Sequence, residues 1–254
     1  MLCIDYAQGG YNGKIMAKGY VLGTVAKNEA TRRKKASKII KILREYKTLE
    51  KSRVLEIGTG AGYIAHELSK VARKVDSVDI VDDRLIKEGF TQKLVTDEAL
   101  PYRAASFDIV ITNHVLEHVP DQERHLSEIR RVLKPDGVVY LASPNKWWLT
   151  DPHYKLPFIS WLPRPVSKLY LLIAKRRKWD IYSVSLSRLT HLAHAEGFHL
   201  ENKAWQLITH PESFGIQPSM LTKFASWLPK KSAKWLLYVV PTHLVVLVSK
   251  EENI

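Results

Sequence analysis

The chain has 254 residues, is 45% hydrophobic and carries a formal net charge of +13. This length allows one large domain with a full core, and no run approaches the roughly 20 apolar residues that a membrane-spanning helix needs. Cys3 is the only cysteine, which excludes an internal disulfide and any metal cluster held by several thiolates.

Residues 1–50 are predicted to form a basic, largely helical segment. The chain begins without a basic start followed by an apolar stretch, so we expect no secretory signal and a cytoplasmic location. After a cap at Asn28, apolar residues recur at helical spacing and predict an amphipathic helix over 29–48. Its polar face carries Arg32, Arg33, Lys34 and Lys35. With 11 basic and 4 acidic side chains, the segment has a net charge of +7.

Residues 51–145 alternate short apolar runs with helical patterns, and residues 51–150 have a net charge of −1. The predicted strands are RVLEI, KVDSVDI, QKLVT, SFDIVITN and GVVYLAS, and the predicted helices are AGYIAHELSKV, DDRLIKEGF and DQERHLSEIRRVL. Strands this continuously apolar, separated by helices, indicate a parallel sheet that is covered on both faces. We therefore predict a doubly wound, Rossmann-like α/β fold.

The remainder of the chain combines two more predicted strands with insertions. Residues 146–182 are rich in Pro and Trp and then basic, with KRRK at 175–178, which suits a cap over the sheet. SLSRLTHLAHAEGF is predicted to be a helix, and FHLENKAWQLIT and THLVVLVSK are predicted to be strands. A helical segment over 219–238 lies in a second cap insertion, 210–240. We expect one domain over 1–254, with a net charge of +7 in residues 151–254.

The stretch VLEIGTGAG places Gly58, Gly60 and Gly62 directly after the first predicted strand. A tight strand-to-helix turn can need such glycines for backbone reasons alone. A dinucleotide loop places pyrophosphate at a helix N-terminus, but Tyr63 stands where its third glycine would be. Glu56 would also repel a pyrophosphate. The loop therefore favours a ligand with a cationic end.

Polar residues also follow the other predicted strands. The second strand ends in Asp79, where a carboxylate can accept hydrogen bonds from both hydroxyls of a ribose. The third ends in Asp97, and the turn through Glu98 and Ala99 can offer a carboxylate and a backbone N–H to an adenine. The fourth ends in Asn113. Together these positions describe a nucleoside with a positively charged tail.

The motifs EIGTGAG, VDSVDI, TDEALPYRAASFDIVITNHVLEHV and RVLKPDGVVYLASPN resemble, in order and spacing, the class I S-adenosylmethionine-dependent methyltransferases. The likeness is to their small-molecule branch, typified by quinone-ring methylases, and it covers residues 50–145 well and 183–250 loosely. It implies a seven-stranded, mostly parallel sheet with an antiparallel last strand and helical cap insertions. It also implies S-adenosylmethionine as the cofactor and no metal.

The resemblance also assigns the cofactor contacts. The glycines would line the methionine end above Glu56, Asp79 would take the ribose, Asp97 with Glu98 the adenine, and Asn113 would lie near the amino-acid portion. The full predicted set is Glu56, Gly58, Thr59, Gly60, Gly62, Asp79, Ile80, Asp97, Glu98, Ala99 and Asn113.

Methyl transfer needs alignment of the two reactants and sometimes a base. His153, in DPHYKLPF between the fifth strand and the cap, and His114, which follows Asn113 at a strand end, are the predicted candidates for that base. His118 is expected to be structural, and His210 is a weaker candidate. An O- or N-methylase needs a proton acceptor whereas a ring C-methylase can do without one, and the sequence does not separate them.

The insertion PNKWWLTDPHYKLPFISWLP is similar to bacterial methyltransferases of cell-surface polysaccharide and lipid-linked glycan synthesis. This likeness implies a small or lipid-linked acceptor, with a glycan hydroxyl as the leading hypothesis and a quinone or other natural product as an alternative. The Trp residues beside Lys and Arg predict attachment to an anionic membrane surface at its cytoplasmic face.

Two other classes of function stay open. The basic charge suits RNA, but NHVLEHV replaces the Asp/Asn-Pro-Pro-aromatic motif associated with many amino-group methylases of nucleic acids. The third hypothesis is a non-catalytic regulatory protein that binds the cofactor. The acidic residues present at all three cofactor contacts argue against it.

Overall fold

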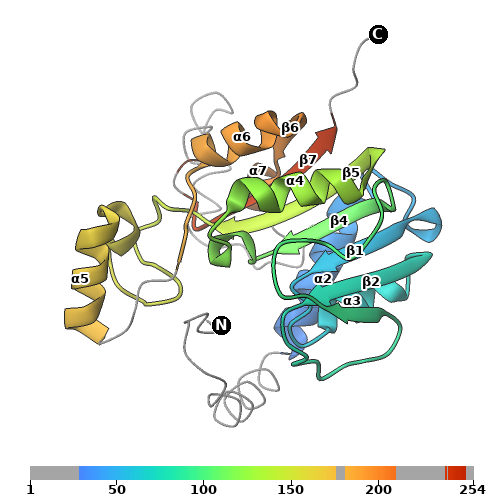
Figure 1. Ribbon diagram of the computed structural model, residues 1–254, viewed down its shortest axis with the longest axis horizontal. Coiled ribbons are helices and arrows are strands. Elements are labelled where there is room, and N and C mark those ends of the chain that lie inside the picture. The colour runs from blue at the N-terminus through green and yellow to red at the C-terminus, as the bar shows by residue number, and fades with distance from the viewer. Residues whose placement is uncertain (1–28, 176–180, 210–237, 239, 250–254) are drawn as a thin grey trace.

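A seven-stranded sheet forms the centre of the protein in the computed structural model, which describes residues 29–175, 181–209, 238 and 240–249 (Figure 1). The strands are β1 (Arg53–Ile57), β2 (Lys74–Asp79), β3 (Thr91–Leu94), β4 (Phe107–Asn113), β5 (Leu133–Pro144), β6 (Phe198–Asn202) and β7 (Thr242–Ser249). Their order is β3-β2-β1-β4-β5-β7-β6. The first five strands pair in parallel, and β7 runs antiparallel to both β5 and β6. The predicted fold class is confirmed.

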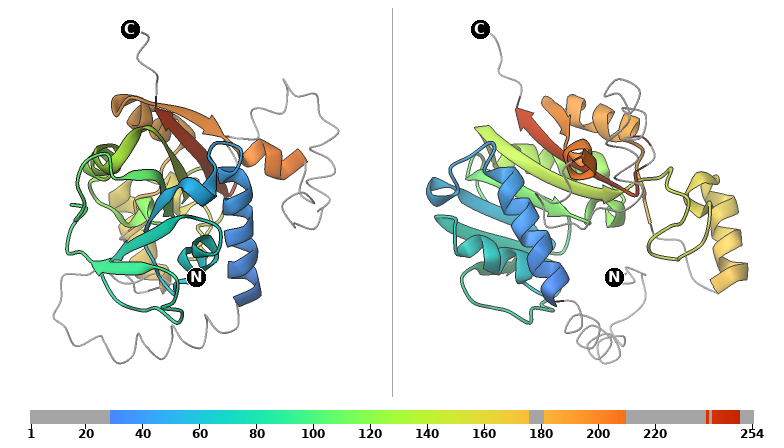
Figure 2. Two further views of the ribbon diagram at one scale, coloured as in Figure 1. Left: turned by 90° about the vertical axis from the view of Figure 1, so that its right-hand side faces the viewer. Right: turned by 180° about the vertical axis from the view of Figure 1, so that it is seen from behind.

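Helices cover both faces of the sheet, as the opposite views in Figures 1 and 2 show. The helices are α2 (Glu29–Leu43), α3 (Tyr63–Ser69), α4 (Gln122–Val132), α5 (Arg164–Lys175), α6 (Leu186–Ala195) and α7 (Ala204–Thr209), with 3-10 turns η1 (Leu49–Lys51), η2 (Leu116–His118) and η3 (Ile159–Trp161). Buried residues of α2 and α3 pack in one hydrophobic cluster, and those of α4 and α6 pack in the other.

The two clusters follow from side-chain alternation along the strands. Val54 and Ile109 belong to the cluster under α2 and α3, while their neighbours Leu55 and Val110 belong to the cluster under α4 and α6. Because successive side chains of a strand point to opposite faces, a strand buried on both sides must be apolar throughout. This requirement explains why the strand pattern was readable from the sequence.

Three predicted elements differ in the structure. DDRLIKEGF forms no helix, because the N–H groups of Leu85 and Ile86 both donate to the carbonyl oxygen of Ala61 instead of to their own turn. β3 ends at Leu94, so Asp97 lies three residues beyond the strand rather than at its end. The helix expected over 29–48 ends at Leu43.

The predicted strand FHLENKAWQLIT is also wrong in its second half. β6 ends at Asn202, and residues from Ala204 onward form α7. The side-chain oxygen of Asn202 accepts a hydrogen bond from the Ala204 N–H at 2.9 Å, which is the arrangement of an Asx turn. A turn therefore ends the strand where the apolar pattern alone would have continued it.

The segment after β5 forms a cap that stands away from the sheet, with α5 at its outer side (Figure 1). Tyr154, Ile159, Leu171 and Ile181 make a small hydrophobic cluster of its own. No helix in the described residues is long and apolar enough to cross a membrane. The helix predicted over 219–238, the cap at Asn28, and His210 lie outside the described residues, and the division into segments stays a prediction.

Candidate functional site

A cavity of about 490 Å³ opens at the carboxyl ends of β1 and β4. The strand order reverses between these two strands, and ligands of open α/β sheets bind at such a switch point. Of the residues predicted for the site, Glu56, Gly58, Thr59, Gly60, Asn113, His114 and His153 line this cavity. The other lining residues include Arg32 and Lys35 of α2 and Trp148 of the cap.

The glycine loop between β1 and α3 forms one wall of the cavity. Gly62 has a φ of +85°, and a Cβ atom there would lie 2.3 Å from the carbonyl oxygen of Ile86. Gly60 has a φ of +51°, but a Cβ atom there would meet nothing within 4 Å. Gly62 is therefore needed for the fold, whereas Gly60 leaves its backbone open to a ligand.

Glu56 lies at the bottom of the cavity and is almost fully buried, with 1% of its surface exposed. Its Oε2 atom has no hydrogen-bond partner. Burial raises the pKa of this carboxyl well above its usual range, and the nearby charge of Asp79 raises it further. A buried carboxylate oxygen without a partner fits the ammonium or sulfonium group of a ligand better than any anionic group.

Two cations from α2 line the same cavity. Burial, together with the neighbouring charges of Lys38 and Arg32, lowers the pKa of Lys35 to about 8. Arg32 has a buried Nε atom without a partner. These groups can hold a carboxylate, so the cavity offers cations and a buried anion to the two ends of an amino-acid zwitterion. S-adenosylmethionine has such an end, and the residues present fit it.

Asp79 and Ile80 lie beside the glycine loop, outside the residues that line the cavity. The Asp79 carboxylate accepts hydrogen bonds from the Gly60 N–H at 2.9 Å and from the Ile80 N–H at 2.7 Å. Burial raises the pKa of Asp79, although these backbone bonds oppose the shift. Asp79 thus fixes the turn whose backbone faces the cavity.

Asp97, Glu98 and Ala99 do not line the cavity. The Asp97 carboxylate accepts a hydrogen bond from the Ala99 N–H at 2.8 Å, which closes the turn after β3. Asp97 and Ala99 are exposed, and Glu98 is half-buried. The structure therefore separates these three predicted adenine contacts from the seven residues gathered around the cavity.

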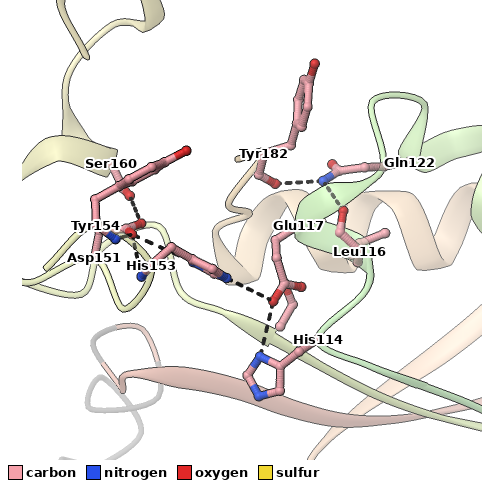
Figure 3. Close-up of polar contacts among 10 residues, drawn as sticks. His114, Leu116, Glu117, Gln122, Asp151, His153, Tyr154, Ser160 and Tyr182 are labelled. Carbon is pink, nitrogen blue, oxygen red and sulfur yellow. Dashed lines mark hydrogen bonds and ion pairs between the residues drawn. The ribbon is translucent and has the colours of Figure 1, made fainter. Parts of the chain in front are cut away.

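The two candidate histidines meet at a buried carboxylate, Glu117 (Figure 3). His114 Nδ1 lies 3.2 Å from Glu117 Oε1, and His153 Nε2 lies 3.9 Å from the same oxygen. The hydroxyl of Ser143 donates to Glu117 Oε2 at 3.3 Å. Burial alone would raise the pKa of Glu117, but the contact with His114, a backbone hydrogen bond and the nearby His118 together lower it.

The orientation of the two imidazoles differs. His114 presents Nδ1 to Glu117, and its backbone adopts a φ of +61° immediately after β4. His153 presents Nε2 to Glu117, and its buried Nδ1 has no hydrogen-bond partner. A carboxylate that accepts the Nδ1–H of a histidine leaves Nε2 with a lone pair that can accept a proton. The geometry therefore suits His114 for the role of a base.

His153 is held from the cap side by Asp151. The Asp151 carboxylate accepts hydrogen bonds from the His153 N–H at 2.8 Å and from the Ser160 hydroxyl at 2.9 Å (Figure 3). Ligand atoms of Glu117, His118 and His153 also lie within 4.8 Å of one another, a spacing that could hold a metal ion. Sequence analysis predicted no metal, and this group is the place at which a metal would bind if that prediction is wrong.

Glu117, Arg32 and Lys35 are the residues of the site that sequence reasoning missed. The helix carrying Arg32 and Lys35 was predicted, but both were assigned to a polar face. Glu117 lies three residues beyond His114, and an acid at this distance from a histidine at a strand end is the signal that could have found it.

A comparison with models of known protein families finds a match to one family. The model of the methyltransferase domain matches residues 28–203. A ubiquinone biosynthesis O-methyltransferase of Nitrosococcus oceani is 26% identical over 117 residues, which are 42% of this chain and 50% of that protein. A probable S-adenosylmethionine-dependent methyltransferase of Mycolicibacterium smegmatis is 36% identical over 99 residues, or 37% of this chain and 38% of that protein. The chain thus spans half or less of these relatives.

Solved structures show the same fold. The S-adenosylmethionine-dependent methyltransferase of Mesorhizobium loti superposes with a TM-score of 0.54 at 16% identity, covering 82% of this chain and 95% of that one.

Proposed function

Since the chain belongs to the methyltransferase-domain family of class I S-adenosylmethionine-dependent enzymes, we propose that it transfers a methyl group to a hydroxyl of a small or lipid-linked acceptor. The family and the cofactor predicted from the sequence are confirmed. The observation that carries the proposal is the cavity in which the unpartnered, buried Glu56 faces the same space as Arg32 and Lys35. This charge arrangement matches the methionine end of the cofactor.

The cofactor supplies an activated methyl group when bound. The chain has to bind the cofactor, orient the acceptor toward it and exclude water. Glu56 would hold the cationic part of the methionine end, and Arg32 with Lys35 would hold its carboxylate. The loop of Gly58, Thr59 and Gly60, which lines the same cavity, would face it. For the nucleoside end we propose the contacts predicted from the sequence. Asp79 and Ile80 bind the ribose, and Asp97, Glu98 and Ala99 bind the adenine.

His114 accepts the proton of the acceptor hydroxyl at Nε2, and Glu117 positions the ring and stabilises its protonated form. His153 shares Glu117 and lines the same cavity, so it is the second candidate for this role. The acceptor hydroxyl and the methyl group of the cofactor would therefore meet beside His114 and His153, in the cavity that Trp148 also lines.

This assignment is tested with cofactor labelled in its methyl group. The protein is incubated with glycolipid and glycan precursors, quinol precursors and RNA, each with and without a chelator and added divalent metals. Replacing a general base lowers turnover by about 10²- to 10⁴-fold. We expect His114→Gln to do so while binding of S-adenosylhomocysteine is unchanged.

His191→Gln, a change at an exposed histidine on α6, is the matched control, and His153→Gln tests the second candidate. If both His114→Gln and His153→Gln keep full turnover, neither imidazole is the base. Label found in quinol precursors or in RNA would replace the glycan hydroxyl with one of those acceptors. Absence of any label, with cofactor still bound, would favour the non-catalytic alternative.

The exposed side of α5 supports the membrane attachment that we propose. Val166, Leu169 and Ile173 follow helical spacing and are 47%, 58% and 74% exposed. Arg164 and Lys168 lie on the same helix and are exposed. A helix with an apolar stripe flanked by cations is suited to lie in the interface of an anionic bilayer. A lipid-linked acceptor would be found at this surface.

The attachment is tested by sedimentation with vesicles. Burying one such side chain contributes about 1.5 to 3 kcal/mol, so Leu169→Gln and Ile173→Gln should each weaken binding by about tenfold or more. Leu94→Gln is the control, because Leu94 is 59% exposed on the edge strand β3, remote from α5 in sequence. Binding should rise with anionic lipid and fall with salt. If the protein stays in the supernatant with strongly anionic vesicles at low salt, the attachment is refuted.

A further inference from the structure

A second cavity of about 420 Å³ lies where the cap meets the core. Among its lining residues are three cations, Lys146, Arg164 and Arg188, and the hydroxyl residues Ser160, Ser183 and Ser185. No Asp or Glu is among the residues that line it. We call this space the basic groove. Its charge selects an anion, and the hydroxyls of Ser183 and Ser185 can donate to oxygen atoms.

Two of the three cations lack an acidic partner within the part of the chain that the structure describes. The Arg164 guanidinium lies 4.1 Å from the centre of the Tyr182 ring, and the Lys146 ammonium lies 5.3 Å from that of Trp147. Stacking on an aromatic ring orients a guanidinium and leaves its N–H donors available. Arg188 pairs with Glu123 at 2.7 Å, but both side chains are largely exposed, so this pair is weak.

The hydroxyls add donors to the groove. Ser183 Oγ is buried without a hydrogen-bond partner. A buried hydroxyl normally has one, so this atom indicates a partner that the protein itself does not provide. Ser185 caps α6, because its Oγ accepts from the Arg188 N–H at 3.2 Å. The positive end of the helix dipole thus adds to the field of the three cations.

We propose that the basic groove binds a phosphate or diphosphate group. Planar Arg donors, a Lys ammonium and hydroxyls are the groups that bind phosphate oxygens in proteins. Two of these cations are available without breaking an ion pair, and their two positive charges equal the two negative charges of a diphosphate diester.

The groove adjoins the candidate active site. The Ser160 hydroxyl donates to the Asp151 carboxylate, which in turn accepts from the His153 N–H (Figure 3). The Tyr182 N–H donates to the carbonyl oxygen of Glu117 at 2.7 Å. A molecule with a phosphate in the groove could therefore extend toward the histidines. This part of the inference rests on the proposed function, whereas phosphate binding does not.

The phosphate could belong to a lipid-linked acceptor or to the headgroup of a membrane phospholipid. Both present the same chemistry, so the experiment has a soluble arm and a membrane arm. In the soluble arm the full chain is titrated with inorganic pyrophosphate by calorimetry. In the membrane arm it is sedimented with phosphatidylglycerol vesicles, with phosphatidylcholine vesicles as reference, in the presence and absence of pyrophosphate.

Each charge-assisted contact is expected to change affinity by about tenfold or more. Arg164→Gln and Lys146→Gln should therefore each weaken pyrophosphate binding by that factor. Lys51→Gln, at an exposed lysine of η1, should not. Displacement of the protein from phosphatidylglycerol vesicles by pyrophosphate would identify the lipid headgroup as a source of the phosphate.

The proposal is overturned if pyrophosphate binds more weakly than about 10 mM and vesicle binding is unaffected by Lys146→Gln, a change outside α5. It is also overturned if Lys51→Gln weakens binding as much as Arg164→Gln and Lys146→Gln do. The same variants are titrated with S-adenosylhomocysteine. If the unchanged protein does not bind S-adenosylhomocysteine, the proposed function is refuted. Phosphate binding in the basic groove is then decided by the pyrophosphate titration alone.

Discussion

Replacing Glu56 by Gln tests the central contact of the proposed cofactor site. The change keeps the shape of a side chain that is 1% exposed and removes its negative charge. A hydrogen bond to a charged group contributes about 1.5 to 3 kcal/mol, so cofactor affinity should fall by about 10- to 150-fold. Affinity for S-adenosylhomocysteine, which keeps the ammonium group but lacks the sulfonium charge, should fall within the same range.

Glu56→Gln should weaken cofactor binding, but it should not lower the stability of the protein without cofactor. Because the pKa of Glu56 is raised in the folded state, the folded protein retains the proton at pH values where the unfolded chain has lost it. Stability therefore falls as pH rises from the usual value of 4.5 toward the raised pKa. Glu56→Gln removes this loss, so the variant should be as stable as the unchanged protein at pH 7 or more stable.

The assay is thermal or urea unfolding with and without cofactor. At a cofactor concentration about 100 times Kd, binding stabilises the unchanged protein by about 2.7 kcal/mol; if Kd rises about 100-fold, only about 0.4 kcal/mol remains. Glu50→Gln, a change at an exposed carboxylate, should keep the full effect. The reasoning is refuted if Glu56→Gln binds cofactor as tightly as the unchanged protein, or if it is less stable without cofactor.

Three further predictions concern charge. Asp79→Ala and Asp97→Ala should each weaken cofactor binding by about 10- to 150-fold with the fold intact, and unchanged affinity in both would reject the ribose and adenine assignments. Because the pKa of Lys35 is about 8, cofactor affinity should fall as pH rises past that value, and Lys35→Gln should flatten the profile; an identical profile in the variant would contradict this role. Burial lowers the pKa of His125 and of His243 to about 4, so stability in urea should fall as pH drops from 6.5 toward 4, with a smaller slope in His125→Gln than in the unchanged protein.

The strands could be predicted because their signal is local. β1 and β4 are buried between two layers of helices, so each had to be apolar along most of its length. Predicted and observed ends of these two strands agree to within one residue. Because the two strands run parallel, their carboxyl ends place the glycine loop and Asn113 at one end of the sheet.

The wrong elements have a different cause. The apolar spacing in DDRLIKEGF suits a helix, yet the carbonyl oxygen of Ala61, some twenty residues earlier, takes the N–H groups of Leu85 and Ile86. In the predicted strand FHLENKAWQLIT, the side chain of Asn202 closes a turn before α7. A hydrogen-bond partner supplied by another segment, or by one turn-forming side chain, outweighs a weak local preference for helix or strand.

The sequence by itself determined the sheet, the turn that needs Gly62, and the presence of an acid, Glu56, beneath that turn. These follow from rules that act over a few residues: apolar continuity, backbone conformation and the order of strands. Tertiary structure alone decided that Lys35 from α2 faces the same cavity as Glu56, and that Glu117 lies between His114 and His153. Burial and charge act over distances of a few ångströms in space, and residues that are far apart in the sequence become neighbours only when the chain has folded.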